Sequence, residues 1–231
     1  MSPRPEYRSY QFAGHDENAL CLGMGASRRI LIIPPLFDEM NRCRRMLVQA
    51  MRGLADRGVG ALLIDLPGCN ESPAALADQS LSTWREAVTA AAAQLEATHI
   101  AALRGGALVD DGAPHLPHWR LAPAKGSSLL KTMIRTRIAG DKEAGKTTSE
   151  AGLIEAARDG PVELAGNVLG PAMVAELATA APDEIAPVTV RVLGQDIAGS
   201  PLWLRAEPQD DPAMSAALAD DLDRWSASCG G

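Results

Sequence analysis

Three short segments of the sequence place charged or amide side chains where apolar runs end. Asp38, Glu39 and Asn41 come shortly after the first run, Asp65 closes the second, and Arg104 directly follows the third. A carboxylate in such a place can act as a general base when its surroundings raise its pKa. A guanidinium stays protonated, and it pairs with carboxylate or phosphate through two parallel hydrogen bonds. These residues are therefore candidates for acid–base chemistry or for anion binding.

The apolar runs are predicted to be the β-strands that position these side chains. They cover residues 29–33, 60–66, 99–103 and 119–122. A β-branched composition bounded by Pro or Gly is typical of strands that are buried on both faces. Apolar residues at helical spacing predict helices over residues 41–57, with Asn41 as the N-cap, and 82–97. Alternating strands and helices with short connections predict an α/β fold, a mostly parallel sheet with helices on both faces.

The remaining segments complete a single domain of residues 1–231. Loose alternation predicts an N-terminal hairpin over residues 7–21, with turn residues at 14–18. Further elements are predicted as helices over 127–139, 150–158, 171–180 and 212–228, a polar connector over 140–148, a small hairpin over 161–169 and a strand over 187–193. Residues 124–186 are therefore expected to form a small helical cap, or lid, inserted between core strands.

The chemical segments occur in the order that an α/β-hydrolase core requires. Residues 34–41 (PPLFDEMN) lie between a strand and a helix, where this fold supplies one backbone N–H of the oxyanion hole. Residues 65–72 (DLPGCNES) are similar to the D-x-x-G-x-G-x-S turn common in the superfamily. Residues 102–106 (ALRGG) stand where the nucleophile elbow G-x-S-x-G belongs, a sharp strand-to-helix turn. The candidate ligand-binding residues are therefore Arg104, Gly105, Leu36, Phe37 and Asn41.

The catalytic triad of that fold is incomplete in this sequence. Arg104 stands in the place of the nucleophile, and a protonated guanidinium has no lone pair with which to attack a carbonyl. The triad also needs a histidine late in the chain, but the four histidines are His15, His99, His115 and His118. The segment after Arg104 is short, although its N–H groups are expected to form a small anion-binding nest. Serine-triad catalysis is therefore not expected.

Four ordered motifs, PPLFDEMNRCRRM, LIDLPGCNES, LRGGAL and GSPLWLRAEP, resemble the exosortase A system-associated hydrolase 2 family. They lie within about residues 28–208. Proteins of this family belong to the α/β-hydrolase superfamily and are encoded near exosortase and exopolysaccharide genes in Gram-negative bacteria with PEP-CTERM proteins. The resemblance implies this fold and a role beside partner proteins of that system. It implies no defined substrate.

Each candidate residue also has a structural interpretation. Arg104 either binds an anionic ligand or forms a salt bridge that ties the elbow to Asp38, Glu39 or Asp65. Asp38, Glu39 and Asn41 either hold Arg104 and act as a base, or cap a helix whose first turn favours acids. Asp65 either takes part in catalysis at the end of the strand or stabilises the following turn with hydrogen bonds. The sequence leaves these alternatives open.

Other reactive side chains lack the partners that chemistry would need. Cys69 and Ser72 have no identifiable neighbouring base, so roles in the turn are favoured. His115 and His118 form an H-x-x-H pair without a carboxylate or cysteine at a fixed offset, so no metal site is expected. Residues 125–128 (KGSS) lack the frame of a phosphate-binding loop, and no cofactor is expected.

Composition argues against several classes of partner and location. The 231 residues carry a formal net charge of −7, which disfavours binding to nucleic acid or to anionic lipid. No apolar stretch is long enough to span a membrane. Four scattered cysteines and an N-terminus without an apolar signal-peptide core predict a cytoplasmic protein.

Three hypotheses of function follow. The first is a divergent member of the superfamily that binds a small acyl or anionic ligand at Arg104 without a triad. The second is an active hydrolase of an ester or thioester, in which Asp38, Glu39 or Asp65 orients a water or an unusual nucleophile. The third is a non-enzymatic interaction protein of exopolysaccharide assembly that uses the surface of the cap. A fold alone does not decide among them.

Overall fold

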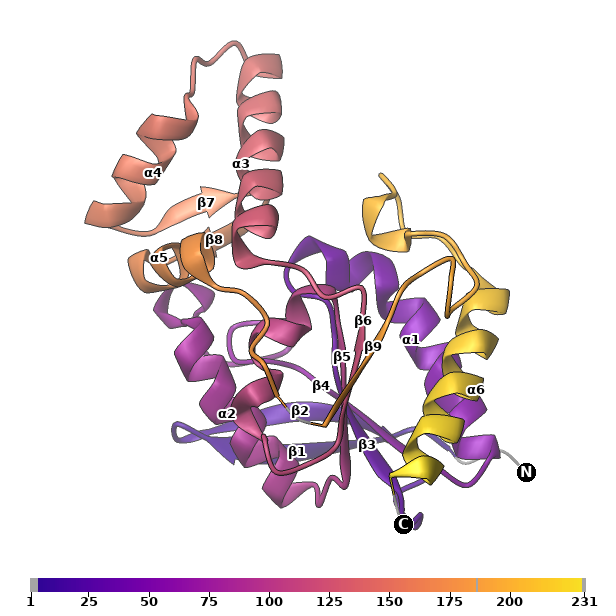
Figure 1. Cartoon of the computed structure of the whole chain (residues 1–231). Helices are drawn as coiled ribbons and strands as arrows, with labels where there is room; N and C mark the ends of the chain where they lie inside the picture. Colours follow the sequence, from indigo (N-terminus) through magenta and orange to yellow (C-terminus); the bar gives the residue numbers. More distant parts are fainter. Residues whose placement is uncertain (1–3, 186, 230–231) are drawn as a thin grey trace.

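A seven-stranded β-sheet forms the centre of the chain (Figure 1). The computed structural model describes residues 4–185 and 187–229. In spatial order the strands are β1 (Glu6–Phe12), β2 (His15–Leu22), β4 (Gly60–Ile64), β3 (Arg29–Ile33), β5 (His99–Leu103), β6 (His118–Leu121) and β9 (Val188–Arg191). β2 pairs antiparallel with both β1 and β4, and the other neighbouring strands pair in parallel. The predicted mostly parallel sheet is confirmed.

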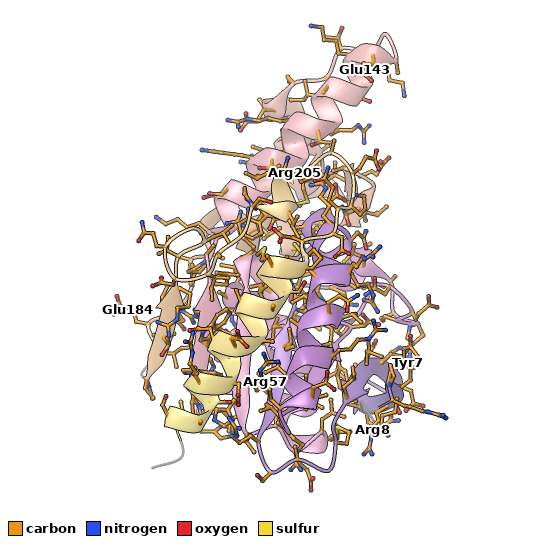
Figure 2. All side chains as sticks on the ribbon, turned by 90° about the vertical axis from the view of Figure 1, so that its right-hand side faces the viewer. Tyr7, Arg8, Arg57, Glu143, Glu184 and Arg205 are labelled. Carbon is orange, nitrogen blue, oxygen red and sulfur yellow. The ribbon has the colours of Figure 1, made fainter. Side chains whose placement is uncertain are left out.

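The central strands send alternate side chains into two separate cores, one on each face. In β3, Leu31 and Ile33 enter the core covered by α2 (Leu81–Gln94). Ile30 and Ile32 enter the core covered by α1 (Asp38–Asp56) and α6 (Pro212–Ser228), which lie side by side in Figure 2. All four side chains are buried. Burial on both faces explains why these strands are apolar throughout instead of alternating.

The chain between β6 and β9 leaves the sheet and forms a group of smaller elements beyond the strand ends (Figure 1). These are α3 (Gly126–Glu143), α4 (Glu150–Asp159), the hairpin β7 (Val162–Leu164) and β8 (Asn167–Leu169), and α5 (Pro171–Thr179). Leu129, Met133 and Leu164 join the core on the α2 side. None of the helices in the described part of the chain combines the length and apolar character of a membrane span.

The start of α1 differs from the prediction. The helix begins at Asp38, three residues before the predicted start, and the residue before it is Phe37 with a φ of 57°. Asn41 is therefore not the N-cap; it lies on the exposed side of the first turns. Asp38 and Glu39 occupy the first turn, where carboxylates interact favourably with the helix dipole, and this favours the earlier start.

Two further boundaries differ for local reasons. α3 runs to Glu143 through part of the predicted connector, because the side chain of Asp141 pairs with Arg137 at 2.8 Å and accepts from the Thr148 hydroxyl at 2.6 Å. The N-terminal hairpin turns at Ala13-Gly14, both with positive φ, so the predicted turn residues 15–18 belong to β2. A two-residue turn with positive φ matches the twist of a hairpin.

Glu17 of β2 is a charged residue in the interior. Its side chain is completely buried, and Ser72 Oγ donates to its Oε1 at 3.0 Å. Its Oε2 has no hydrogen-bond partner in the described part of the chain. Burial raises the pKa of Glu17. The hydrogen bond from Ser72 and the charge of His15 lower it by smaller amounts, and the Asp65 carboxylate adds the smallest effect, which raises it. A raised pKa in the folded state means that stability falls as the pH rises above the ordinary range of a glutamate.

Glu17→Gln is expected to raise the free energy of unfolding by about 1 kcal/mol at pH 8 and by less at pH 5, because the amide cannot ionise and still accepts from Ser72. Urea denaturation at the two pH values measures this. The exposed Glu86→Gln is the control and should change neither value. A Glu17→Gln variant less stable than the wild type at pH 8 would contradict the interpretation.

Candidate functional site

The backbone of a nucleophile elbow is present at Arg104. This residue directly follows β5 and has a φ of 53°, a left-handed conformation that a side chain other than glycine adopts at a cost. Two residues later, a Cβ on Gly106 would lie 2.6 Å from the Pro34 carbonyl oxygen and 2.7 Å from that of Ile33. Only glycine allows this approach. The turn that presents a nucleophile in hydrolases therefore presents a guanidinium in this chain.

The segment after the elbow does not form an α-helix. It consists of two 3-10 turns, η2 (Arg104–Leu108) and η3 (Asp110–Gly112). No α-helix therefore adds its dipole to the N–H groups of this segment, and the anion-binding nest stays a prediction. Gly105 is buried, and a Cβ there would meet side-chain atoms of Leu129 at 2.6 Å and Leu36 at 3.1 Å. Its role in the structure is close packing.

The guanidinium of Arg104 forms a two-point ion pair with Glu39. Its Nε donates to Oε2 at 3.1 Å, and its Nη2 donates to Oε1 at 3.2 Å. Nη1 donates to the Ala122 carbonyl oxygen at 3.1 Å, and the guanidinium carbon lies 4.8 Å from the ring centre of Trp203. The Arg104 and Glu39 side chains are only 18% and 12% exposed. The pair is therefore held by hydrogen bonds, a cation–π contact and partial burial.

The three candidate carboxylates do not meet at one point. Glu39 faces Arg104, whereas Asp38 pairs with Arg42 at 3.3 Å. Asp65 pairs with Arg44 at 3.3 Å and accepts from the amide of Asn70. Of the alternatives left open by the sequence, the structure thus joins Arg104 to Glu39.

Glu39 is the carboxylate whose surroundings resist ionisation. Burial raises the pKa of Glu39, while the hydrogen bonds and positive charge of Arg104 act in the opposite direction. The net shift is upward. A carboxylate with a raised pKa in a pocket has one of the properties of a general base.

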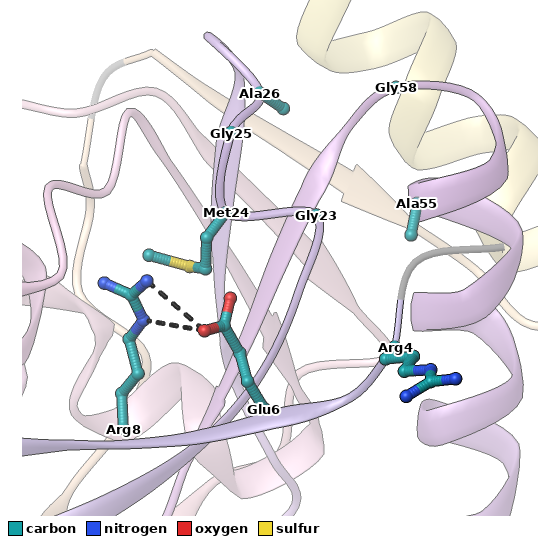
Figure 3. Close-up of a pocket in the computed structure, with 9 residues that line it drawn as sticks. All are labelled: Arg4, Glu6, Arg8, Gly23, Met24, Gly25, Ala26, Ala55 and Gly58. Atoms are coloured by element: carbon teal, nitrogen blue, oxygen red, sulfur yellow. Dashed lines mark hydrogen bonds and ion pairs between the residues drawn. The ribbon is translucent and has the colours of Figure 1, made fainter. Parts of the chain in front are cut away.

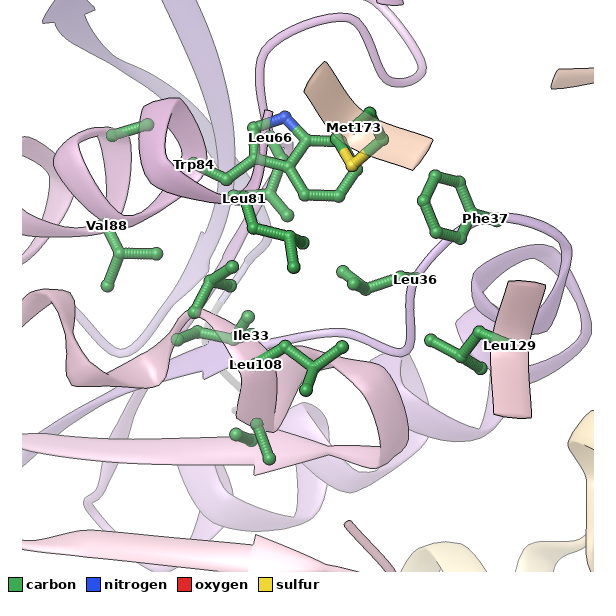
Figure 4. Close-up of a cluster of buried hydrophobic side chains, with 14 of the residues drawn as sticks. Ile33, Leu36, Phe37, Leu66, Leu81, Trp84, Val88, Leu108, Leu129 and Met173 are labelled. Carbon is green, nitrogen blue, oxygen red and sulfur yellow. The ribbon is translucent and has the colours of Figure 1, made fainter. Parts of the chain in front are cut away.

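A cavity of about 180 Å³ opens over this pair. It is lined by Leu36, Phe37, Asp38, Glu39, Arg42, Arg104, Ser128, Leu129, Thr132, Met133, Thr136, Ala165, Trp203 and Leu204. Phe37 packs on Trp84 with ring centres 5.6 Å apart, and Leu36 lies in the same apolar cluster (Figure 4). Of the five predicted ligand-binding residues, Arg104, Leu36 and Phe37 therefore line the cavity. Gly105 and Asn41 are not among its lining residues.

A larger hollow elsewhere has less of the character of a ligand site. It measures about 830 Å³, is shallow, and lies at the start of β1 beside the turn at Gly23 and Met24 (Figure 3). Arg8, one of the charged side chains that line it, is paired with Glu6. The enclosed cavity at Arg104 has apolar walls with a few convergent polar groups, as ligand sites do.

The residue that the sequence interpretation missed is Trp203. It lies in the 3-10 turn η4 (Leu202–Leu204), between β9 and α6, and its carbonyl oxygen accepts from Arg42 at 3.1 Å. In chain order this is the region after the late strands where a triad histidine would be sought. The motif GSPLWLRAEP contained the signal, because an apolar turn with tryptophan stands where that histidine is absent.

The other candidate reactive side chains either form hydrogen bonds within the protein or have a pKa that keeps them protonated. Burial, followed by the negative charge of Asp65, raises the pKa of the Cys69 thiol to about 12. Ser72 Oγ donates to Glu17 and accepts from the Gly68 N–H at 2.8 Å. His118 is buried between the carbonyl oxygens of Leu116 and Asp110. Among the described residues, no group of histidine, cysteine and acidic side chains is arranged to hold a metal ion.

Comparison with solved structures identifies the fold. The esterase Est1E from Butyrivibrio proteoclasticus, solved with ferulic acid bound, is similar with a TM-score of 0.57 and 16% identity, covering 80% of this chain and 77% of its own. A protein from Agrobacterium vitis S4 that is named a putative hydrolase gives a TM-score of 0.54 and 16% identity, covering 84% of this chain and 79% of its own. The sequence matches no protein-family model and no curated protein. The chain has the α/β-hydrolase fold, and identity this low shows the fold alone.

Arg104→Met is expected to lower the free energy of unfolding by about 3 kcal/mol, because it leaves Glu39 largely buried without its partner. The double variant Arg104→Met, Glu39→Gln should recover most of this loss, since the uncompensated charge is then gone. Urea denaturation of the wild type, both single variants and the double variant measures the interaction free energy between the two side chains. Additive losses in the double variant would show that the two side chains are not coupled.

Proposed function

We propose that this protein binds a small acyl or anionic ligand in the Arg104 cavity and does not use a serine triad. The observation that carries the proposal is the Arg104–Glu39 pair at the elbow, beneath Trp203 and beside a cavity of about 180 Å³. In this fold the elbow is the place where the acyl group of a substrate meets the protein. Arginine there offers N–H donors to an oxygen and no nucleophile.

The walls of the cavity support an acyl or aromatic group. Leu36, Phe37, Leu129 and Met133 give an apolar surface, and Thr132 adds a polar group on the α3 side. A cavity of roughly 150 Å³ in another protein holds benzene, so this volume suits a short chain or a single ring. The esterase Est1E, which has a similar fold, was solved with ferulic acid bound. Ferulic acid contains an aromatic ring and an acyl group, and this supports a ligand with such groups.

A second candidate, hydrolysis through a bound water, has one observation in its favour. Glu39 lines the cavity and burial raises its pKa, so it has the position and the proton affinity of a base. Its ion pair with Arg104 opposes this role, because both oxygens of the carboxylate already accept from the guanidinium. Binding without turnover is therefore the function proposed first.

We further propose that the protein acts in the exosortase and exopolysaccharide system, on the support of the four sequence motifs. In that setting a bound acyl group and a partner protein are compatible, because α4 and α5 of the cap contribute no residue to the lining of the cavity. Cytoplasmic location is part of this proposal and rests on the four scattered cysteines. Co-purification from a host that encodes the system would test it.

Ligand binding is tested with hexanamide and hexanoate by saturation-transfer NMR. At least one of the two should bind the wild type, and Thr132→Trp should abolish binding because the indole fills the cavity from the α3 side. Lys131→Trp is the matched control: this neighbouring residue is exposed and does not line the cavity. Failure of both compounds to bind the wild type would contradict the proposal.

Turnover is measured on the same proteins with p-nitrophenyl butyrate and an acyl thioester. We expect release no faster than in buffer and no labelling by a fluorophosphonate probe, because no activated serine is expected. Turnover that disappears in Glu39→Gln would favour the water-based hydrolase instead. Turnover that persists in Arg104→Ala would exclude a catalytic role for Arg104.

A further inference from the structure

We propose that the cavity selects a neutral carbonyl compound, such as an ester or amide, over a free carboxylate, and that Glu39 sets this selectivity. The inference rests on the proposed function and deepens it, because it decides between the two ligand chemistries that the elbow allows. It follows from the ion pair that compensates the charge of Arg104 and from the hydrogen bonds that its N–H groups make within the protein.

The positive charge of Arg104 is compensated before any ligand enters. Glu39 accepts from it at two points, at 3.1 and 3.2 Å, and both side chains are largely buried. The only other charged residues that line the cavity are Asp38 and Arg42, which pair with each other at 3.3 Å. The described lining thus contains two cations and two anions, and no cation lacks a counter-charge.

Arg104 nevertheless keeps donors for an oxygen atom. A guanidinium has five N–H groups. Three of them donate to Glu39 and to the Ala122 carbonyl, so two have no partner in the described part of the chain. A carbonyl oxygen has two lone pairs and can accept from such donors without bringing a charge. The site therefore offers hydrogen bonds but little net electrostatic attraction.

A carboxylate at the same donors would meet the negative charge of Glu39 across the guanidinium. The repulsion from Glu39 offsets part of the attraction to the guanidinium, and the carboxylate also loses hydration on entering the cavity. A neutral carbonyl avoids both penalties. Glu39 is therefore expected to act as a specificity residue, which touches Arg104 and disfavours an anion beside it.

The test uses benzamide and benzoate, two planar molecules of the same shape that differ in charge. A single ring with one carbonyl group suits a cavity of about 180 Å³. The wild type should bind benzamide about tenfold more tightly than benzoate at pH 7 by saturation-transfer NMR titration. In Glu39→Gln the preference should disappear or reverse, because Arg104 then carries an uncompensated charge.

Glu163→Gln is the matched control. It removes the same charge from a glutamate that is paired with Arg137 and is 57% exposed, and neither residue lines the cavity, so the benzamide preference should remain. Wild-type protein that binds benzoate as tightly as benzamide would overturn the inference while leaving ligand binding intact. An equal shift in Glu163→Gln and Glu39→Gln would show that net charge, and not Glu39, sets the preference.

The remaining outcome separates this inference from the proposed function. If neither compound binds the wild type, and hexanamide and hexanoate do not bind either, the proposed function fails and the selectivity with it. The wild-type comparison needs no variant, so a Glu39→Gln protein that does not fold still leaves a result that supports or overturns the inference.

Discussion

The close contact between the end of β5 and the end of β3 is the constraint on which the site depends. Gly106 lies against the carbonyl oxygens of Ile33 and Pro34, and the preceding turn is forced into a positive φ at Arg104. This backbone points residue 104 into the space above the sheet whatever its side chain is. The elbow is therefore a property of packing between two strands, and it persists although the nucleophile is absent.

A guanidinium in that position imposes a second requirement, a counter-charge at the same edge of the sheet. The first turn of α1 supplies it, because Phe37 adopts a positive φ and the helix starts early enough to bring Glu39 under the elbow. Trp203 then covers the pair from the chain segment before α6. Three regions far apart in the sequence thus meet at one ion pair, and the cavity lies between them and α3.

The sequence predicted those parts of the structure that depend on local pattern. Apolar runs located the strands, and Asp211 before Pro212 located α6, whose N-cap accepts from Met214 at 2.9 Å. The sequence did not identify which carboxylate pairs with Arg104, because Asp38, Glu39 and Asp65 all lie near the ends of predicted strands. The choice depends on where α1 begins, and that is set by one unusual φ at Phe37. The contribution of Trp203 depends on a tertiary contact with no local signal beyond its presence in a motif.

The energetics of the pair give a reason to connect it with binding. A largely buried ion pair contributes little net stability, because the loss of hydration offsets most of the attraction, and apolar side chains of similar volume often serve as well. Leu36, Leu129 and Met133 already form an apolar wall around the same space, so folding alone would have been satisfied by extending it. Arg104 and Glu39 instead place hydrogen-bond donors and an ion pair in the lining of the cavity. Under the proposed function, this arrangement orients a polar atom of a ligand while the apolar part of the ligand fills the remaining volume, and folding alone does not require it.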